Sequence, residues 1–204
     1  MLAQRTSRKM PEQESKYYNI EQYGAAVLRE PCATVTKFDR KLEKIADKML
    51  KTMYKENGVG LAAPQVGVKQ RIIVIDTEWA SERYKEEHAN SDKEPEYEPY
   101  VIINPMIVYK EGEMDSYEGC LSFPDVFFKV KRASRIILKY QDLTGKEYRI
   151  EAAEDLFCRC VQHEIDHLNG RLFVDIAVDK AIAREELSKH GFAGVNSPAP
   201  MLLG

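Results

Sequence analysis

Apolar positions at steps of three and four residues mark the helices of this chain. The clearest run covers residues 39–56, and its apolar members are Leu42, Ile45, Ala46, Met49, Leu50 and Met53. This spacing predicts an amphipathic helix with Asp39 as its N-cap and Asn57-Gly58 as its stop signal. A second helix is predicted from residue 154 or 155 to the Asn-Gly pair at 169–170, and a shorter one over residues 178–190.

Short runs rich in β-branched and aromatic residues predict the strands. They cover residues 71–76, 100–109, 133–140, 147–152 and, as a short addition, 171–175. The first run is apolar on both faces, and residues 142–145 form a hairpin turn between the third and fourth runs. Asn104-Pro105 interrupts the second run, which predicts an edge position or a bulge. Together these elements predict an α+β fold, with mostly antiparallel strands packed around the central helix at residues 154–170.

The remaining segments divide the chain into one domain and two tails. Residues 1–17 are polar and predict a disordered arm, residues 18–190 a single domain, and residues 191–204 a flexible tail. Residues 77–99 are rich in Glu, Lys, Ser and Asn and predict a solvated surface excursion. Residues 58–67 are rich in Gly and Ala, which predicts an irregular segment whose backbone can be approached closely. That segment lacks the Gly-Lys-Ser/Thr ending of a phosphate-binding loop.

Composition and charge remove several classes of function. The chain has 204 residues, of which 44% are hydrophobic and 31% charged, and a net charge of −3. These values give no sign of a nucleic-acid surface or a polybasic membrane anchor. No apolar run approaches the roughly 20 residues that span a bilayer, and the N-terminus lacks the apolar stretch of a secretory signal. Four cysteines are too few for a disulfide scaffold, which predicts reduced thiols in a cytoplasmic compartment, with an organelle left open.

The candidate chemistry lies in residues 162–168, which read Gln-His-Glu-Ile-Asp-His-Leu. In a helix, His163 and His167 lie one turn apart on one face, where two imidazoles can hold one metal ion. Glu164 stands beside the first imidazole and can take a proton from an activated water and pass it to a leaving group. Because the chain has only four histidines, a chance match has odds of roughly one in a hundred. The central helix is therefore predicted to bear a catalytic metal.

A hydrolytic metal site usually has three protein ligands and one open position, so a third ligand is needed. Cys160 shares the helical face, but it lies about 4.5 Å beyond His163 along the axis, and its side chain is too short to reach back to the metal. Cys160 and Cys158 are therefore predicted to be core residues. Cys120 lies in a Gly-Cys-Leu-Ser-Phe-Pro context that predicts an irregular strand end. Such a strand end is a rigid mount from which the Cys120 thiolate can meet the helix, so Cys120 is favoured.

Three segments together resemble the peptide deformylases in order and in spacing. They are Gly-Val-Gly-Leu-Ala-Ala-Pro-Gln at 58–65, Glu-Gly-Cys-Leu-Ser-Phe-Pro at 118–124 and the histidine motif at 162–168. The similarity extends over roughly residues 20–175. The residues that it implies are the metal ligands Cys120, His163 and His167, the general base and acid Glu164, and the oxyanion-hole donors Gln65 (side-chain amide) and Leu121 (backbone N–H).

The same resemblance implies a reaction, which is hydrolysis of the N-formyl group from N-formylmethionyl nascent peptides with release of formate. It implies ferrous iron as the native metal, and the ligand set also suits zinc, nickel or cobalt. The implied partners are the formylmethionyl peptide and ribosome-associated nascent chains, with no direct contact to nucleic acid or membrane. The implied substrate-binding residues are Val59, Gly60, Leu61, Glu118 and Cys160, with Arg132 as the cation that holds Glu118.

Two other interpretations of the histidine pair stay open. One is a His-Glu-x-x-His metallopeptidase whose third ligand is a downstream carboxylate, Glu185 or Glu186, which leaves Cys120 without a role. The other is a structural zinc module in which all four positions are filled and water is excluded. Its ligands would be Cys158, Cys160, His163 and His167.

The chain also departs from the family that it resembles. Phe127 and Phe128 stand where the family often has polar or basic residues near the cleft, and the excursion at 77–99 is longer than the family leads us to expect. The two phenylalanines leave open which substrate side chains are preferred beyond methionine.

Overall fold

The computed structural model of the protein describes residues 15–79 and 99–193. Its helices are the 3₁₀ helices η1 (Ala26–Arg29), η2 (Ala63–Val66) and η3 (Phe173–Ile176) and the α-helices α1 (Arg40–Lys55), α3 (Leu156–Leu168) and α4 (Lys180–Lys189). Its strands are β1 (Gly60–Ala62), β2 (Ile72–Ile75), β3 (Tyr100–Glu111), β4 (Met114–Cys120), β5 (Phe123–Arg132), β6 (Arg135–Gln141) and β7 (Glu147–Ala153). Most of the predicted arm, excursion and tail lies outside the described residues, so the division of the chain into a domain and two tails stays a prediction.

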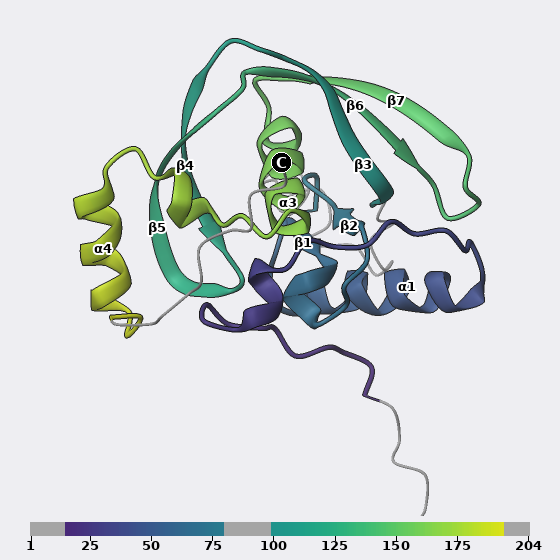
Figure 1. The fold of residues 1–204 in the computed structure, drawn as a ribbon, viewed down its shortest axis with the longest axis horizontal. Coiled ribbons are helices and arrows are strands. Elements are labelled where there is room, and N and C mark those ends of the chain that lie inside the picture. Colours follow the sequence, from purple (N-terminus) through teal and green to yellow (C-terminus); the bar gives the residue numbers. More distant parts are fainter. Residues whose placement is uncertain (1–14, 80–98, 194–204) are drawn as a thin grey trace, which may run out of the picture.

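The strands form two antiparallel sheets around α3. In the five-stranded sheet the neighbours are β1, β2, β3, β6 and β7 in that order, and β4 pairs with β5 in a two-stranded ribbon. Figure 1 shows α3 between the two sheets, with α4 on the outer side of the ribbon and α1 beside β1 and β2. The predicted α+β class, with mostly antiparallel strands around a central helix, is confirmed.

Helix α3 is positioned by its caps and by one apolar face. The Asp155 carboxylate accepts a hydrogen bond from Cys158 N at 2.6 Å, and the chain leaves the helix at Gly170, whose φ is +69°. A Cβ on Gly170 would lie 2.4 Å from the carbonyl oxygen of Arg29, so no larger residue fits at this stop. The side chains that pack into the core with β2, β3 and β6 are Cys158, Val161, Ile165 and Leu168. The predicted bounds of this helix are confirmed, and its polar side chains lie on the remaining face.

Helix α1 and the segment after it cover the end of the sheet at β1 and β2. Asp39 caps α1 by accepting hydrogen bonds from two backbone N–H groups, as predicted. The apolar positions of the predicted period that are buried are Leu42, Ala46, Met49 and Met53. The next segment, predicted to be irregular, contains β1, which pairs with β2 from Gly60 opposite Ile75 to Ala62 opposite Ile73. The short strand was not predicted, because its Gly and Ala residues carry no β signal of their own.

Strand β3 continues through Asn104-Pro105 in the interior of the sheet. It lies between β2 and β6, so the predicted edge position is wrong, whereas the predicted bulge is confirmed by a register shift between Ile103 and Met106. Asn104 has a φ of +51°. Its side chain replaces the interrupted ladder bonds by accepting from Val35 N at 2.8 Å and donating to Val35 O at 2.9 Å.

Two further local predictions miss the observed structure. Residues 171–175 were predicted as a strand, but η3 forms there because the Asp175 carboxylate accepts a hydrogen bond from Leu172 N at 2.8 Å and pairs with Arg29. Of the β4–β5 ribbon, the sequence predicted only an irregular strand end at Cys120, where β4 does end. Most of β4 is Asp, Ser, Tyr, Glu and Gly, a composition in which no apolar alternation appears.

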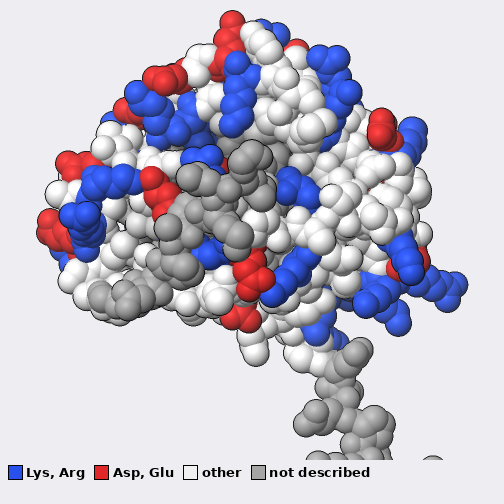
Figure 2. Space-filling view, viewed as in Figure 1, with Lys and Arg blue, Asp and Glu red and all other residues white. Residues whose placement is uncertain are grey.

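The described surface carries charges of both signs. On the face shown in Figure 2, Lys and Arg side chains are interspersed with Asp and Glu side chains along the outer edge. Helical pairs such as Lys51–Asp47 and Lys189–Glu185 bring opposite charges together. None of the helices in residues 15–79 and 99–193 combines the length and apolar character needed to cross a bilayer.

Candidate metal centre

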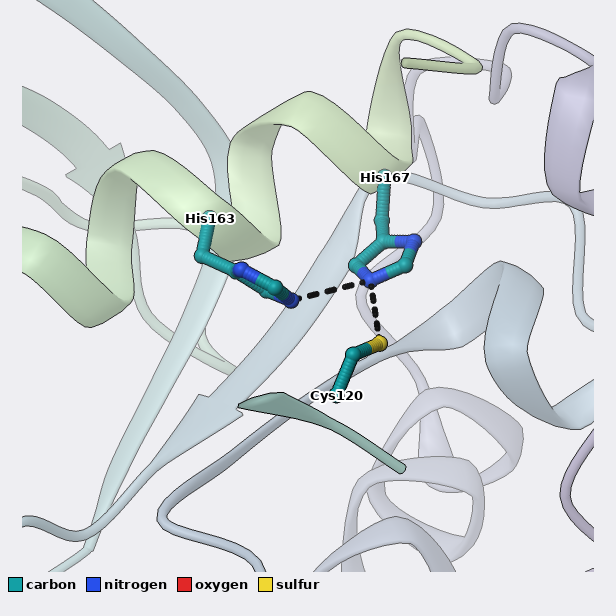
Figure 3. Close-up of side chains that lie close together, drawn as sticks. All are labelled: Cys120, His163 and His167. Atoms are coloured by element: carbon teal, nitrogen blue, oxygen red, sulfur yellow. Dashed lines mark hydrogen bonds between the residues drawn. The ribbon is translucent and has the colours of Figure 1, made fainter. Parts of the chain in front are cut away.

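Two imidazoles from α3 and one thiol from the end of β4 meet in the interior. The Nε2 atoms of His163 and His167 are 3.2 Å apart, and Cys120 Sγ is 3.3 Å from His167 Nε2. Figure 3 shows both imidazoles leaving the same side of the helix and pointing toward the sulfur. All three potential ligand atoms lie within 4.8 Å of one another. Among the described residues, no other group of His, Cys, Asp and Glu side chains converges this closely.

The three side chains fit a single divalent ion. Metal–nitrogen bonds of about 2.0–2.1 Å and a metal–sulfur bond of about 2.3 Å place neighbouring tetrahedral ligand atoms roughly 3.3–3.6 Å apart. The observed separations of 3.2 and 3.3 Å are close to those values. Two imidazoles and a thiolate are also donors that iron, zinc, nickel and cobalt accept. The trio supplies three of the four ligands of a tetrahedral ion, and Cys120 and His163 line the cleft through which water can reach the fourth position, as a hydrolytic site requires.

A buried network of charged residues orients His163. Glu118 Oε2 lies 2.9 Å from His163 Nδ1, and the Arg132 guanidinium donates two hydrogen bonds to the same carboxylate at 2.9 and 2.8 Å. Arg132 also pairs with Asp166. Burial alone would raise the pKa of Glu118, but the hydrogen bonds from Arg132 and His163 outweigh it and lower that pKa to about 2. Glu118 is therefore ionised, and it holds a proton on Nδ1 of His163 so that Nε2 is free to bind a metal.

We expect Arg132→Met to lower the free energy of unfolding by about 3–5 kcal/mol, because it leaves the buried Glu118 carboxylate without its cation. Arg132 is 6% exposed and its partner Glu118 9% exposed. Urea denaturation of the metal-loaded protein measures the change. The matched control is Arg135→Met, since Arg135 pairs with Glu111 and Glu151 on the surface. An equal loss in both variants would contradict the role given to the buried network.

The carboxyl group of Glu164 lies between β1 and the histidines. Glu164 is buried, and its Oε2 has no hydrogen-bond partner among the described residues. A Cβ on Gly60 would lie 2.6 Å from Glu164 Oε1 and 2.5 Å from Cys160 Sγ, so this glycine lets the strand approach the carboxylate closely. Burial raises the pKa of Glu164 to about 7. A carboxyl group with such a pKa can both accept and release a proton near neutral pH.

Gln65 and Leu121 flank the thiol. The Gln65 Oε1 accepts a hydrogen bond from Ala62 N at 2.8 Å, which directs its Nε2 toward Cys120 Sγ (3.5 Å) and Ser122 Oγ (3.3 Å). Leu121 follows the thiol in the turn between β4 and β5, and its side chain would meet a Cβ on Gly58 at 2.7 Å. Both residues line the same cleft as the candidate ligands His163 and Cys120.

This cleft has a volume of about 620 Å³ and borders the metal centre. It is bounded by β1, the β4–β5 ribbon and α3, and the predicted binding residues that line it are Val59, Gly60, Glu118 and Cys160. The side chain of Leu61 is fully buried and packs in the apolar cluster that contains the buried side chains of α1. Only the backbone of Leu61, as part of β1, lies beside the cleft. Phe127 lines the cleft and is 60% exposed. The expectation for Phe128 is wrong, because its ring is buried and stacks on Phe173 at 4.2 Å.

The ligands of the two alternative sites are not brought together. Cys158 Sγ faces the carbonyl oxygens of Ala133 and Ser134 at 3.8 Å, in the core. Cys160 Sγ lies beside Glu164, and burial raises the pKa of its thiol. Both cysteines are thus core residues, as predicted. Glu185 and Glu186 lie on α4, where both pair with Lys189, and neither joins His163 and His167.

Some contributors to the site were not singled out in the sequence. Asp166 pairs with Arg132, and the hydroxyl of Ser122 accepts a hydrogen bond from the side-chain amide of Gln65. Both residues lie inside the segments 162–168 and 118–124, but no role was predicted for them. Gln162 ties α3 to the sheet through Ala133 N at 3.0 Å and Ala133 O at 2.9 Å. Arg159 lines the cleft one helical turn before His163. The helical period was the available signal for Arg159, because positions i and i+4 share a face.

The chain is similar to known proteins over most of its length. Residues 17–182 match the family model described as Polypeptide deformylase. A peptide deformylase of Synechococcus sp. (strain RCC307) is 41% identical over 182 residues, covering 89% of this chain and 84% of the relative. One of Thermosynechococcus vestitus is 44% identical over 170 residues, covering 83% of each chain. The crystal structure of a peptide deformylase from Synechococcus elongatus in complex with actinonin has a TM-score of 0.77 at 38% identity, covering 92% of this chain and 95% of that one.

Proposed function

The chain belongs to the polypeptide deformylase family, and we propose that Cys120, His163 and His167 hold the metal ion with which it hydrolyses N-formylmethionyl nascent peptides. Members of this family are metal-dependent hydrolases that remove the N-formyl group and release formate. The observation that supports the assignment of ligands is the distance of 3.3 Å between Cys120 Sγ and His167 Nε2. In the metallopeptidase alternative the third ligand is a downstream carboxylate, and in the structural zinc module the thiols are Cys158 and Cys160. Neither alternative assigns a role to the Cys120 thiol.

We propose ferrous iron as the native metal. The ligand set is equally suited to zinc, nickel and cobalt, so the choice of iron comes from the resemblance to the family. When bound, a divalent ion supplies Lewis acidity, which lowers the pKa of water and polarises the formyl carbonyl. Glu118 contributes by holding His163 in the tautomer that presents Nε2 to the ion.

Glu164 is the group that moves protons in this proposal. Its carboxyl lines the cleft next to His163, and no other residue in the described part of the chain hydrogen-bonds to its Oε2. It accepts a proton from the water that attacks the formyl carbon. It then donates a proton to the methionine nitrogen as the carbon–nitrogen bond breaks. Water and the N-formyl peptide thereby become formate and a peptide with a free amino group.

The side-chain amide of Gln65 and the backbone N–H of Leu121 are the proposed donors to the oxygen that becomes negative during the attack. Both are neutral, so they stabilise the developing charge without adding a cation to a site that already holds a metal. Gln65 is 1% exposed, and its amide is held by the hydrogen bond from Ala62 N. Such preorganised donors cost little reorganisation at the moment of reaction.

We expect Gln65→Ala to lower kcat by about 10²–10³-fold while the metal content stays unchanged, because one oxyanion donor is lost and no ligand is removed. Formate release and metal analysis on the same preparation measure both quantities. Gln70→Ala is the control, since Gln70 lies outside the cleft. Loss of metal from Gln65→Ala would move this residue from the oxyanion hole to the support of the ligands.

The peptide substrate is proposed to bind along β1. This strand lies at one end of the five-stranded sheet. Its first residue, Gly60, and the preceding residue, Val59, line the cleft. An extended peptide can add to such an edge through backbone hydrogen bonds. The methionine side chain would then enter between Val59, Cys160 and the face of α3 next to His163. Nascent chains emerge as extended polymers, which suits recognition through the backbone.

Three wider expectations also stand as proposals. The enzyme would meet its substrates as nascent chains at the ribosome, in a bacterial-type cytoplasm or an organelle that makes its own proteins. Its catalytic domain would comprise residues 18–190, close to the 17–182 span of the family match. Truncation to residues 18–190 with retained formate release would support this boundary, and loss of activity would contradict it.

Formate release from formyl-Met-Ala under anaerobic conditions tests the proposed function. The metal-free protein is reloaded with iron, nickel or zinc, and the products are identified by mass spectrometry. We expect formate and intact Met-Ala, with turnover abolished by removal of the metal. Cleavage of the Met–Ala bond without formate would favour the metallopeptidase interpretation instead.

A further inference from the structure

One cation in the wall of the cleft has no part in the reaction described above. Arg159 lies on α3 one turn before His163, is half-buried and lines the cleft. Leu156 and His163 share its helix face and line the cleft, and the adjacent residue Cys160 also lines it. The side chain of Arg159 therefore lies on the same wall as the metal ligand, farther from the metal.

The guanidinium of Arg159 is held in place but is not neutralised. Its Nη1 donates a hydrogen bond of 2.9 Å to Ser116 Oγ. Among the described residues, this is the one hydrogen bond that the side chain makes. Ser116 is 4% exposed. The Nε–H of Arg159 is buried and finds no acceptor within residues 15–79 and 99–193. Arg159 has no carboxylate partner among the described residues, so the guanidinium fixed by this buried hydroxyl adds hydrogen-bond donors to this part of the wall.

The position of Arg159 matches the far end of the first side chain of the substrate. Four residues of helix separate it from His163, or about 6 Å along the axis. An extended methionine side chain reaches about 5 Å beyond its Cα, given bonds of about 1.5 Å. With the formyl group at the metal centre and the side chain between Val59 and Cys160, the sulfur comes to the level of Arg159. This placement rests on the proposed function.

We propose that Arg159, held by Ser116, is a specificity-determining residue that donates a hydrogen bond to an acceptor at the end of the first side chain. The substrate class that follows includes formyl peptides whose methionine sulfur has been oxidised to the sulfoxide. A sulfoxide oxygen is a strong acceptor, a thioether sulfur a weak one, and the methylene of norleucine none. A purely apolar wall would reject the sulfoxide, because its polar oxygen would lose its hydration without compensation.

Three formyl peptides of nearly equal shape test this inference. They are formyl-Met-Ala-Ser, its sulfoxide with the two epimers separated, and formyl-norleucine-Ala-Ser. The measured quantity is the ratio of kcat/KM for the sulfoxide to kcat/KM for norleucine, which cancels general losses of activity. We expect Arg159→Met to lower this ratio about tenfold or more for at least one epimer, because a charge-assisted hydrogen bond is lost. Arg159→Lys, which keeps the cation, is expected to retain part of the discrimination.

Matched variants keep the test decisive. Arg149→Met makes the same replacement at an exposed position outside the cleft and should keep the wild-type ratio. Ser116→Ala removes only the hydroxyl that holds the guanidinium and should lower the ratio in the same direction, which serves if Arg159→Met does not fold. A ratio within about twofold of wild type in both cleft variants overturns the inference. Wild-type protein that releases no formate from formyl-Met-Ala-Ser contradicts the proposed function, which is a different result.

Discussion

Glu164→Gln is expected to keep its metal and its fold while kcat for formate release falls by about 10²–10⁴-fold, the usual contribution of a general acid–base group. The amide has nearly the shape of the carboxyl but cannot accept the proton of the attacking water. The side chain is not in the trio of ligand atoms, so metal binding should survive. Formate release, metal content and thermal unfolding, measured on one preparation, check the three parts of this expectation.

The control for this prediction is Glu185→Gln, which makes the same change on the exposed side of α4, where Glu185 pairs with Lys189. Its turnover should equal that of the wild type. Undiminished turnover of Glu164→Gln would remove Glu164 from the mechanism. Loss of metal together with activity would instead give Glu164 a role in holding the site, and the structural zinc interpretation would regain weight.

Cys120→Ala is expected to lose more than about 100-fold in metal affinity, and its turnover with it. Replacement of residues behind the ligands already costs 10–100-fold in such sites, and this change removes a ligand itself. Cys120 is partly exposed at the end of β4, lies outside the central core around α3 and packs only against the margin of the cluster that contains Phe123 and Phe173. The protein should therefore stay folded. Chelator competition gives the affinity, and circular dichroism tests whether the fold is retained.

Cysteine and glutamate variants elsewhere separate the alternatives. Cys158→Ala replaces a buried thiol that faces backbone carbonyls, so it should keep the metal. Glu185→Ala and Glu186→Ala should keep it as well. Retention of metal by Cys120→Ala with its loss from either glutamate variant would favour the metallopeptidase. Loss from Cys158→Ala but not from Cys120→Ala would favour the structural zinc module.

Local signals predicted the elements that carry most of the chemistry. The bounds of α1 and α3 followed from apolar periods closed by Asp39 and Asp155 at one end and by glycine at the other. These caps act within a few residues, so the surrounding fold does not need to be known. The β6–β7 hairpin was predicted for the same reason, since a short turn joins its strands.

Other elements depend on partners that are distant in the sequence. The polar strand β4 exists because β5 pairs with it and because Glu118 finds Arg132 and His163 behind it. Strand β1 exists because β2 supplies its ladder. The turn at η3 forms around an ion pair between Asp175 and Arg29. Propensity scales average over many proteins and contain none of these partners.

The spacing of His163 and His167, and the place of Glu164 between them, was determined by the sequence alone, because a helix of 3.6 residues per turn sets those relations locally. Only the tertiary structure decided which thiol meets them. Cys120 is 47 residues from His167 in the chain, and the packing of the β4–β5 ribbon against α3 brings the two together. Burial was decided there too, and it raises the pKa of Glu164. At Glu118 the hydrogen bonds from Arg132 and His163 outweigh burial and keep the carboxylate ionised. Reactivity in this protein thus depends on the exclusion of water, a property of the packed chain and of no segment by itself.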